Sequence, residues 1–157
     1  SRNQNELKGM GATLVLFVVC GMEYAVLNIG DSRAYHFNNE ALIQITKDHT
    51  EGQRMLDLGL LTRKELSGFP ARKNLNRYIG YGQNGYVLQA DEYYPILDNG
   101  VMLLCSDGIS DYLPDSRISE ILHSANNLES AGKQLINEAV ASYNADNATV
   151  MLIPLRR

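Results

Sequence analysis

The sequence predicts an α+β protein in which strands and helices are stacked in layers. One observation is that its apolar segments rich in Val, Leu, Ile and Phe are short, as residues 13–20 and 101–105 illustrate. A second is that two segments near the C-terminus repeat apolar residues at helical spacing. Because strands and helices come in blocks and do not alternate, a layered fold is favoured over a chain of βαβ units.

The N-terminal part of the chain predicts four strands. Two apolar runs are separated only by Gly21-Met22, which is typical of a β-hairpin. Two further short runs follow, one after Gly30-Asp31 and one after Asn38-Asn39. We therefore expect a meander of four strands at residues 13–20, 23–29, 32–37 and 41–45.

Residues 51–74 predict a small helical insertion. Met55, Leu56 and Leu58 group on one face of a short helix that Gly59 would end. Thr62 and Glu65 have the S/T-x-x-E spacing of a capping box, which indicates the start of a second short helix.

The remaining half of the chain predicts a mixture of strands and two longer helices. Glycines at positions 80, 82 and 85 indicate a flexible joint between two of the strands. The expected strands are residues 75–79, 86–94, 101–105 and 147–155, and the expected helices are one directly after Pro114 and one over residues 128–143.

Composition narrows the class of protein. The chain has 157 residues, a net charge of −4 and 45% hydrophobic residues, which predicts a single domain with an apolar core. The acidic balance argues against a general nucleic-acid binder. The longest apolar run, residues 14–20, is much shorter than the roughly 20 residues of a membrane-spanning helix. With a polar N-terminus that lacks a secretion signal, we expect a soluble, cytoplasmic protein.

Three aspartates occupy the ends of predicted strands: Asp31, Asp107 and Asp146. Carboxylates at the rims of neighbouring strands can converge, and their oxygens are ligands that Mg²⁺ or Mn²⁺ prefers. The chain has no CxxC pair and no histidine cluster, which argues against a zinc site. The spacing alone leaves a second interpretation open, in which these residues only hydrogen-bond their own turns. The histidines His36, His49 and His123 are expected on a strand face, in a loop and on an exposed helix face.

Six short segments follow one another in a characteristic order: residues 9–13 (GMGAT), 28–35 (NIGDSRAY), 48–50 (DHT), 75–80 (LNRYIG), 104–111 (LCSDGISD) and 146–150 (DNATV). In this order they resemble the metal-dependent protein serine/threonine phosphatases of the 2C, or PPM, type from bacteria. The resemblance covers nearly the whole chain, and residues 51–74 resemble the flap subdomain of that family. It implies a layered α-β-β-α sandwich of antiparallel sheets.

The resemblance also implies a catalytic site. Asp107 and Asp146 would be catalytic ligands of a binuclear Mg²⁺ or Mn²⁺ centre, and Asp31 would help to bind a third ion. In the family, a hydroxide that bridges the metals attacks phosphoserine or phosphothreonine in a protein substrate. Arg33 would have a structural role, and Asn147 would hold the turn that orients Asp146.

The chain departs from the family pattern at its N-terminus, where no counterpart of the family's metal-binding DGMGG element precedes Gly9. We therefore expect residues 1–157 to form a single, partial phosphatase domain, incomplete at the N-terminus. Apolar strand faces between residues 13 and 29 would lack cover, so a homodimer or a missing N-terminal segment is expected to cover them. The same departure favours an alternative function, a non-catalytic pseudophosphatase or regulatory binding domain. A third possibility is a structural domain whose aspartates only form turns.

Overall fold

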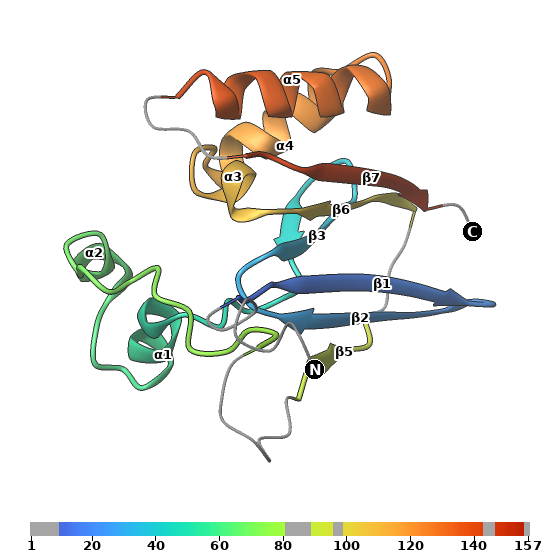
Figure 1. The fold of residues 1–157 in the computed structure, drawn as a ribbon. Coiled ribbons are helices and arrows are strands. Elements are labelled where there is room, and N and C mark those ends of the chain that lie inside the picture. Colours follow the sequence, from blue (N-terminus) through green and yellow to red (C-terminus); the bar gives the residue numbers. More distant parts are fainter. Residues whose placement is uncertain (1–9, 81–88, 96–98, 143–146, 156–157) are drawn as a thin grey trace, which may run out of the picture.

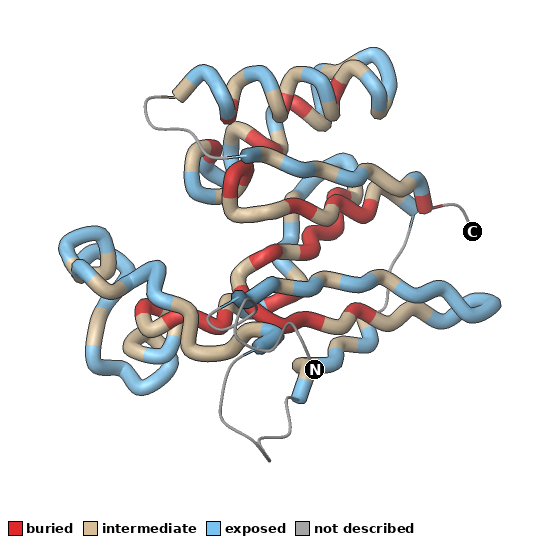
Figure 2. Tube along the Cα trace, in the orientation of Figure 1, coloured by how far each residue is buried: buried red, intermediate tan, exposed pale blue. Residues whose placement is uncertain are grey.

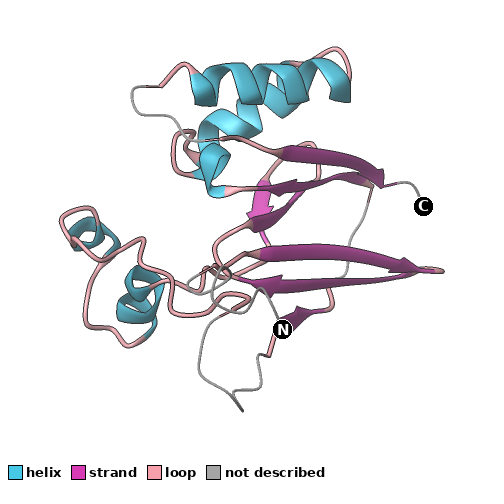
Figure 3. Ribbon diagram, viewed as in Figure 1, coloured by secondary structure: helices cyan, strands magenta, loops and turns pink. Residues whose placement is uncertain are grey.

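The computed structural model describes residues 10–80, 89–95, 99–142 and 147–155. Two antiparallel sheets lie face to face, and helices cover the outer side of one of them (Figures 1 and 3). The predicted α+β class with antiparallel sheets is confirmed. Residues 51–74 carry two short helices that project beside the sheets (Figure 1).

The first sheet has the strand order β1-β2-β5, and the second has the order β4-β3-β6-β7. The first sheet consists of β1 (Leu14–Cys20), β2 (Glu23–Ile29) and β5 (Asp91–Tyr93). The second sheet contains β3 (Arg33–Phe37), β4 (Leu42–Gln44), β6 (Gly100–Cys105) and β7 (Val150–Leu155). The helices are α1 (Glu51–Asp57), α2 (Arg63–Leu66), α3 (Asp107–Ser110), α4 (Asp115–Ser124) and α5 (Leu128–Val140).

The predicted hairpin is confirmed, but the four-strand meander is wrong. β1 and β2 pair in register from Leu14 opposite Ile29 to Cys20 opposite Glu23. β3 does not continue that sheet and pairs with β4 and β6 in the second sheet. The chain changes sheets at Gly30, whose φ of 105° is unfavourable for residues with a side chain. This backbone conformation interrupts the ladder that a meander would require.

Several other predicted elements differ in extent. Residues 75–79 form no strand and make only two isolated bridges, Thr50 to Leu75 and Ala12 to Ile79. The strand expected over 86–94 is limited to β5, and residues 86–88 lie outside the described residues, as do positions 82 and 85 of the expected joint. α5 ends at Val140, with residue 143 again outside the described part. The short helix α3 was not predicted.

The end signals of the two short helices are confirmed. The Thr50 side chain accepts the Gln53 N–H at the start of α1, and Gly59 follows the helix with a φ of 67°. Thr62 and Glu65 form the reciprocal capping box of α2. Leu58, expected on an apolar face, is exposed because it lies at the end of α1.

Side chains that alternate along the second sheet supply two apolar cores. Buried residues, red in Figure 2, occur on strands of both sheets and on the helices above them. Tyr35 and Leu103 point toward α4 and α5, where they pack in the same cluster as Ile121 and Leu135. The other face packs against the first sheet through residues of both sheets, including Ala34, Met102, Val26 and Phe17. This double burial rigidly holds the strand ends that carry the candidate site.

The outer face of the β1–β2 hairpin is apolar and exposed. Leu14, Leu16 and Val18 alternate along β1 and are 38%, 44% and 40% exposed. Among the described residues, no helix covers this face (Figure 1). The described residues therefore form three layers, helix, sheet and sheet, one fewer than in the expected α-β-β-α sandwich. In the part of the chain that the structure describes, every helix is too short or too polar to traverse a lipid bilayer.

Candidate functional site

A polar cavity of about 270 Å³ lies between the 51–74 segment and the start of α3. Aspartates contribute much of its lining, while basic side chains from the 51–74 segment face them. The charged lining residues are Asp31, Arg33, Asp48, Arg63, Arg72, Lys73, Asp107, Asp111 and Asp115. The cavity thus combines cation-binding groups with groups that attract an anion.

Two of the three predicted site aspartates, Asp31 and Asp107, line this cavity together. Asp31 follows β2 in the turn before β3, and Asp107 follows β6. Since Arg33 of β3 pairs with Cys105 of β6, both aspartates emerge at the same edge of the second sheet. Burial and then the neighbouring Asp107 carboxylate raise the pKa of Asp31 to about 6.

Asp146 lies outside the described residues, but the chain that follows it is close to Asp107. The backbone of Ser106 donates to the Thr149 carbonyl at 3.1 Å, and the Thr149 N–H donates to the Ser106 hydroxyl at 3.1 Å. A Cβ on Gly108 would lie 2.2 Å from the Asn147 carbonyl oxygen, so only glycine permits this approach. That Asp146 joins the cluster, and that Asn147 orients it, both stay predictions.

Asp111 is a site residue that the sequence analysis missed. It is the C-cap residue that follows α3, and its N–H donates to the Asp107 carbonyl at 2.8 Å, which places both residues on one side of a single helical turn. Its carboxylate also contributes to the raised pKa of Asp31. Had a helix been predicted after Ser106, the four-residue spacing between Asp107 and Asp111 would have indicated that both side chains lie on the same helix face.

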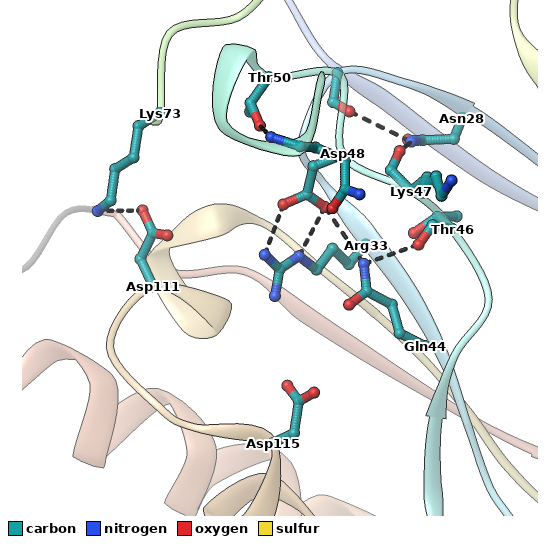
Figure 4. A network of polar contacts seen from close by, with 12 residues as sticks. Asn28, Arg33, Gln44, Thr46, Lys47, Asp48, Thr50, Lys73, Asp111 and Asp115 are labelled. Carbon is teal, nitrogen blue, oxygen red and sulfur yellow. Dashed lines mark hydrogen bonds and ion pairs between the residues drawn. The ribbon is translucent and has the colours of Figure 1, made fainter. Parts of the chain in front are cut away.

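Lys73 connects the 51–74 segment to this acidic cluster. Its ammonium lies 2.6 Å from the Asp111 carboxylate and 5.9 Å from the centre of the Tyr112 ring. Figure 4 shows the Lys73 and Asp111 side chains extending toward each other, with their ion pair as a dashed line. Both contacts hold the 51–74 segment against α3.

Arg33 makes the contacts that its expected structural role requires. Its Nε and Nη2 atoms donate to the two oxygens of Asp48 at 2.8 and 2.6 Å, a bidentate pair that Figure 4 displays. Its Nη1 donates to the Tyr35 hydroxyl, which in turn donates to Asp115. Burial opposes the charged form, yet the hydrogen bonds with Asp48 raise the pKa of Arg33 above its usual value. The guanidinium therefore stays charged and ties β3 to the chain before α1.

His49 is not the ordinary loop histidine that the sequence suggests. Its side chain is 6% exposed and lies between Gly30 and Asp91. The other histidines match their expected settings, because His36 lies on β3 and His123 is exposed on α4. The local sequence does not predict the burial of His49, because the residues that its ring contacts, Gly30 and Asp91, belong to other segments of the chain.

The donor set fits a hard dication only in part. Among the described residues, no group of three or more His, Cys, Asp or Glu side chains is arranged to hold a metal ion. The described candidates, Asp31 and Asp107, supply carboxylate oxygens, the donors that Mg²⁺ and Mn²⁺ prefer. A dication held by these carboxylates would offset the burial and the charge repulsion that raise the pKa of Asp31. Asp146, which lies outside the described residues, is the candidate for a further ligand.

The sequence and the fold of this chain are similar to those of bacterial serine/threonine phosphatases. The chain is 31% identical over 153 residues to the serine/threonine phosphatase stp of Listeria monocytogenes, covering 98% of this chain and 60% of that protein. A crystal structure of the serine/threonine phosphatase PstP/Ppp of Mycobacterium tuberculosis matches with a TM-score of 0.86 and 32% identity, over 98% of this chain and 64% of that one.

A second crystal structure, of the PstP catalytic domain in complex with two manganese ions, matches with a TM-score of 0.75 and 32% identity. It covers 95% of this chain and 60% of that one. No family model matches the chain. The chain spans about 60% of the length of the Listeria relative. With this likeness extending over nearly all of its residues, the chain belongs to the PPM family of serine/threonine phosphatases.

Proposed function

We propose that this chain is part of a metal-dependent protein phosphatase that hydrolyses phosphoserine and phosphothreonine in protein substrates. The observation that carries the proposal is the pairing of Asp31 with Asp107 in one polar cavity of a chain from this family. Such a pair of carboxylates is costly unless a cation compensates it, so its burial supports a metal-binding role.

The proposed roles follow the position of each residue. Asp107 and Asp146 would be ligands of a binuclear centre, and Asp31 would help to hold a third ion. Mg²⁺ and Mn²⁺ both suit these oxygen donors, with two or three ions in the complete domain. When bound, the ions would supply an activated water as the nucleophile and neutralise charge on the phosphoryl oxygens.

The basic side of the cavity suits a phosphorylated substrate. Arg63 and Arg72 come from the 51–74 segment and line the same cavity as the aspartates. Guanidinium groups bind phosphate oxygens with paired hydrogen bonds. We propose that these two arginines attract the dianionic substrate, while Lys73 is already paired with Asp111.

Organisation and partners are part of the same proposal. Residues 1–157 would form a single partial domain in which residues 51–74 are a flap-like insertion. The exposed outer face of β1 supports a partner that covers it, either a second copy or a preceding segment of the parent protein. A cytoplasmic location is proposed for the whole protein. The alternative of a non-catalytic pseudophosphatase is not favoured, because the relatives are named as phosphatases.

The direct test is release of phosphate from a phosphothreonine peptide by the parent protein, with Mn²⁺ and with EDTA. We expect Asp107→Asn to reduce the Mn²⁺-dependent rate by more than about 100-fold, a larger effect than that of residues which only support a metal ligand. Asp57→Asn is a matched control, since Asp57 is exposed on α1 and pairs with Lys47. Normal activity in Asp107→Asn would overturn the assignment of its role.

A further inference from the structure

His49 holds Gly30, the residue directly before Asp31, at two points. The backbone N–H of His49 donates to the Gly30 carbonyl at 2.9 Å. In the other direction, the Gly30 N–H donates to Nδ1 of the His49 ring, also at 2.9 Å. Both backbone polar groups of Gly30 are therefore bound by buried His49, and the side-chain amide of Asn28 also donates to the Gly30 carbonyl at 3.3 Å.

The far side of the ring is bound as well. Nε2 of His49 lies 3.0 Å from Oδ2 of Asp91, and Arg77 pairs with the other oxygen of that carboxylate. Since Nδ1 accepts a hydrogen bond, the ring proton of neutral His49 is on Nε2, from which it donates to Asp91. Asp91 lies on β5 and Arg77 follows the 51–74 segment, so the ring orientation is set by two distant parts of the chain.

The backbone at Gly30 needs such support because glycine itself restricts its φ and ψ angles only weakly. Its φ is 105°, and a Cβ at this position would lie 2.4 Å from Cγ2 of Thr13, so no other residue fits. Glycine has few intrinsic restrictions on rotation of the adjoining peptides. The direction of the Asp31 side chain therefore depends on how both peptides that flank the Gly30 Cα are held. Nδ1 of His49 binds the N–H of the first peptide, and the His49 backbone N–H binds the carbonyl of the second peptide, which leads to Asp31.

We propose that His49 is a positioning residue for Asp31: it fixes the two peptides that flank Gly30 and so aims the Asp31 carboxylate into the cavity that it shares with Asp107. The inference rests on the proposed metal-binding function of Asp31. It assigns His49, Asp91 and Arg77 a supporting role in dication affinity. This resembles the general behaviour of metal sites, in which groups behind the ligands set ligand orientation.

Two variants separate the two sides of the ring. In His49→Asn, the amide oxygen lies near the position of Nδ1 and can still accept the Gly30 N–H, but the side chain is too short to reach Asp91. In His49→Gln, the amide nitrogen lies near the position of Nε2 and can still donate to Asp91, but the acceptor for Gly30 is lost. A residue that only fills space would give similar results in both variants.

The first measurement is Mn²⁺ affinity of the chain by isothermal titration calorimetry. We expect His49→Gln to weaken binding by about 10–100-fold and His49→Asn to weaken it much less. Equal losses in both variants, or no loss in His49→Gln, would overturn the proposal. If neither the unaltered chain nor its parent protein binds Mn²⁺, the proposed function itself fails.

The second measurement needs no metal and directly tests the hydrogen bond from the Gly30 N–H to Nδ1 of His49, which we call the clamp. In EDTA, hydrogen exchange of the Gly30 amide should accelerate in His49→Gln and remain slow in His49→Asn. A Gly30 amide that stays protected in His49→Gln contradicts the role of Nδ1. If a variant fails to fold, ¹⁵N shifts of the His49 ring in the unaltered chain decide the question, because a proton on Nδ1 is incompatible with the clamp.

Discussion

Replacing Asp31 by Asn should stabilise the metal-free chain at neutral pH. Asp31 is partly buried beside Asp107, and the pKa of its carboxyl is raised from 3.8 to about 6. Above that pH the folded protein must keep this carboxylate ionised against desolvation and the charge of its neighbour. Asparagine has nearly the same shape and carries no charge, so it removes this penalty.

The size of the effect follows from the two pKa values. The difference between 3.8 and about 6 corresponds to roughly 3 kcal/mol at neutral pH. Because Asp31 is partly accessible to solvent, screening reduces this to about 1–2 kcal/mol. For a chain of this size, that range corresponds to an increase in Tm of about 2–8 °C.

The pH dependence of the stability gain shows whether the charge of Asp31 is its cause. The folded state retains the Asp31 proton to higher pH than the unfolded state does, so the penalty appears as pH rises from about 4 through 6. The advantage of Asp31→Asn should be complete at pH 7.5 and absent near pH 4. Thermal unfolding in EDTA, followed by circular dichroism at both pH values, measures it.

The control is Asp57→Asn on the surface of α1. Hydrogen bonds from Lys47 and Gln53 hold the pKa of Asp57 below its usual value, so removal of its charge should give no increase in Tm. An equal gain for Asp31→Asn at pH 4 and pH 7.5 would show that charge is not the cause. A lower Tm at pH 7.5 would refute the reasoning altogether.

Two further predictions concern the approach of two chain segments and the exposed sheet. Gly108→Ala places a Cβ 2.2 Å from the Asn147 carbonyl oxygen, which must displace α3 or the chain before β7. Calorimetry should then show Mn²⁺ affinity reduced more than about tenfold, as expected when ligand orientation is disturbed, and unchanged affinity would argue against Asp146 as a ligand. Leu16→Lys introduces a charge on the apolar outer face of β1 and should reduce any self-association seen by light scattering. A chain that is monomeric with and without this change would contradict the proposed second copy.

Local sequence signals correctly predicted the elements whose boundaries depend on residues close together in the sequence. The hairpin at Gly21 and the capping box of Thr62 and Glu65 are examples, because turn and cap geometry involve residues only a few positions apart. The order of the motifs along the chain also sufficed to identify the family and to select Asp31 and Asp107 as candidates.

Only the tertiary structure decided which segments meet. It divided the strands between two sheets at Gly30, added Asp111 to the acidic cavity and buried His49 between Gly30 and Asp91. Each of these facts depends on hydrogen bonds and packing between residues far apart in the chain. Periodicity reports which face of an element is apolar, but it carries no information about the partner that the face will find.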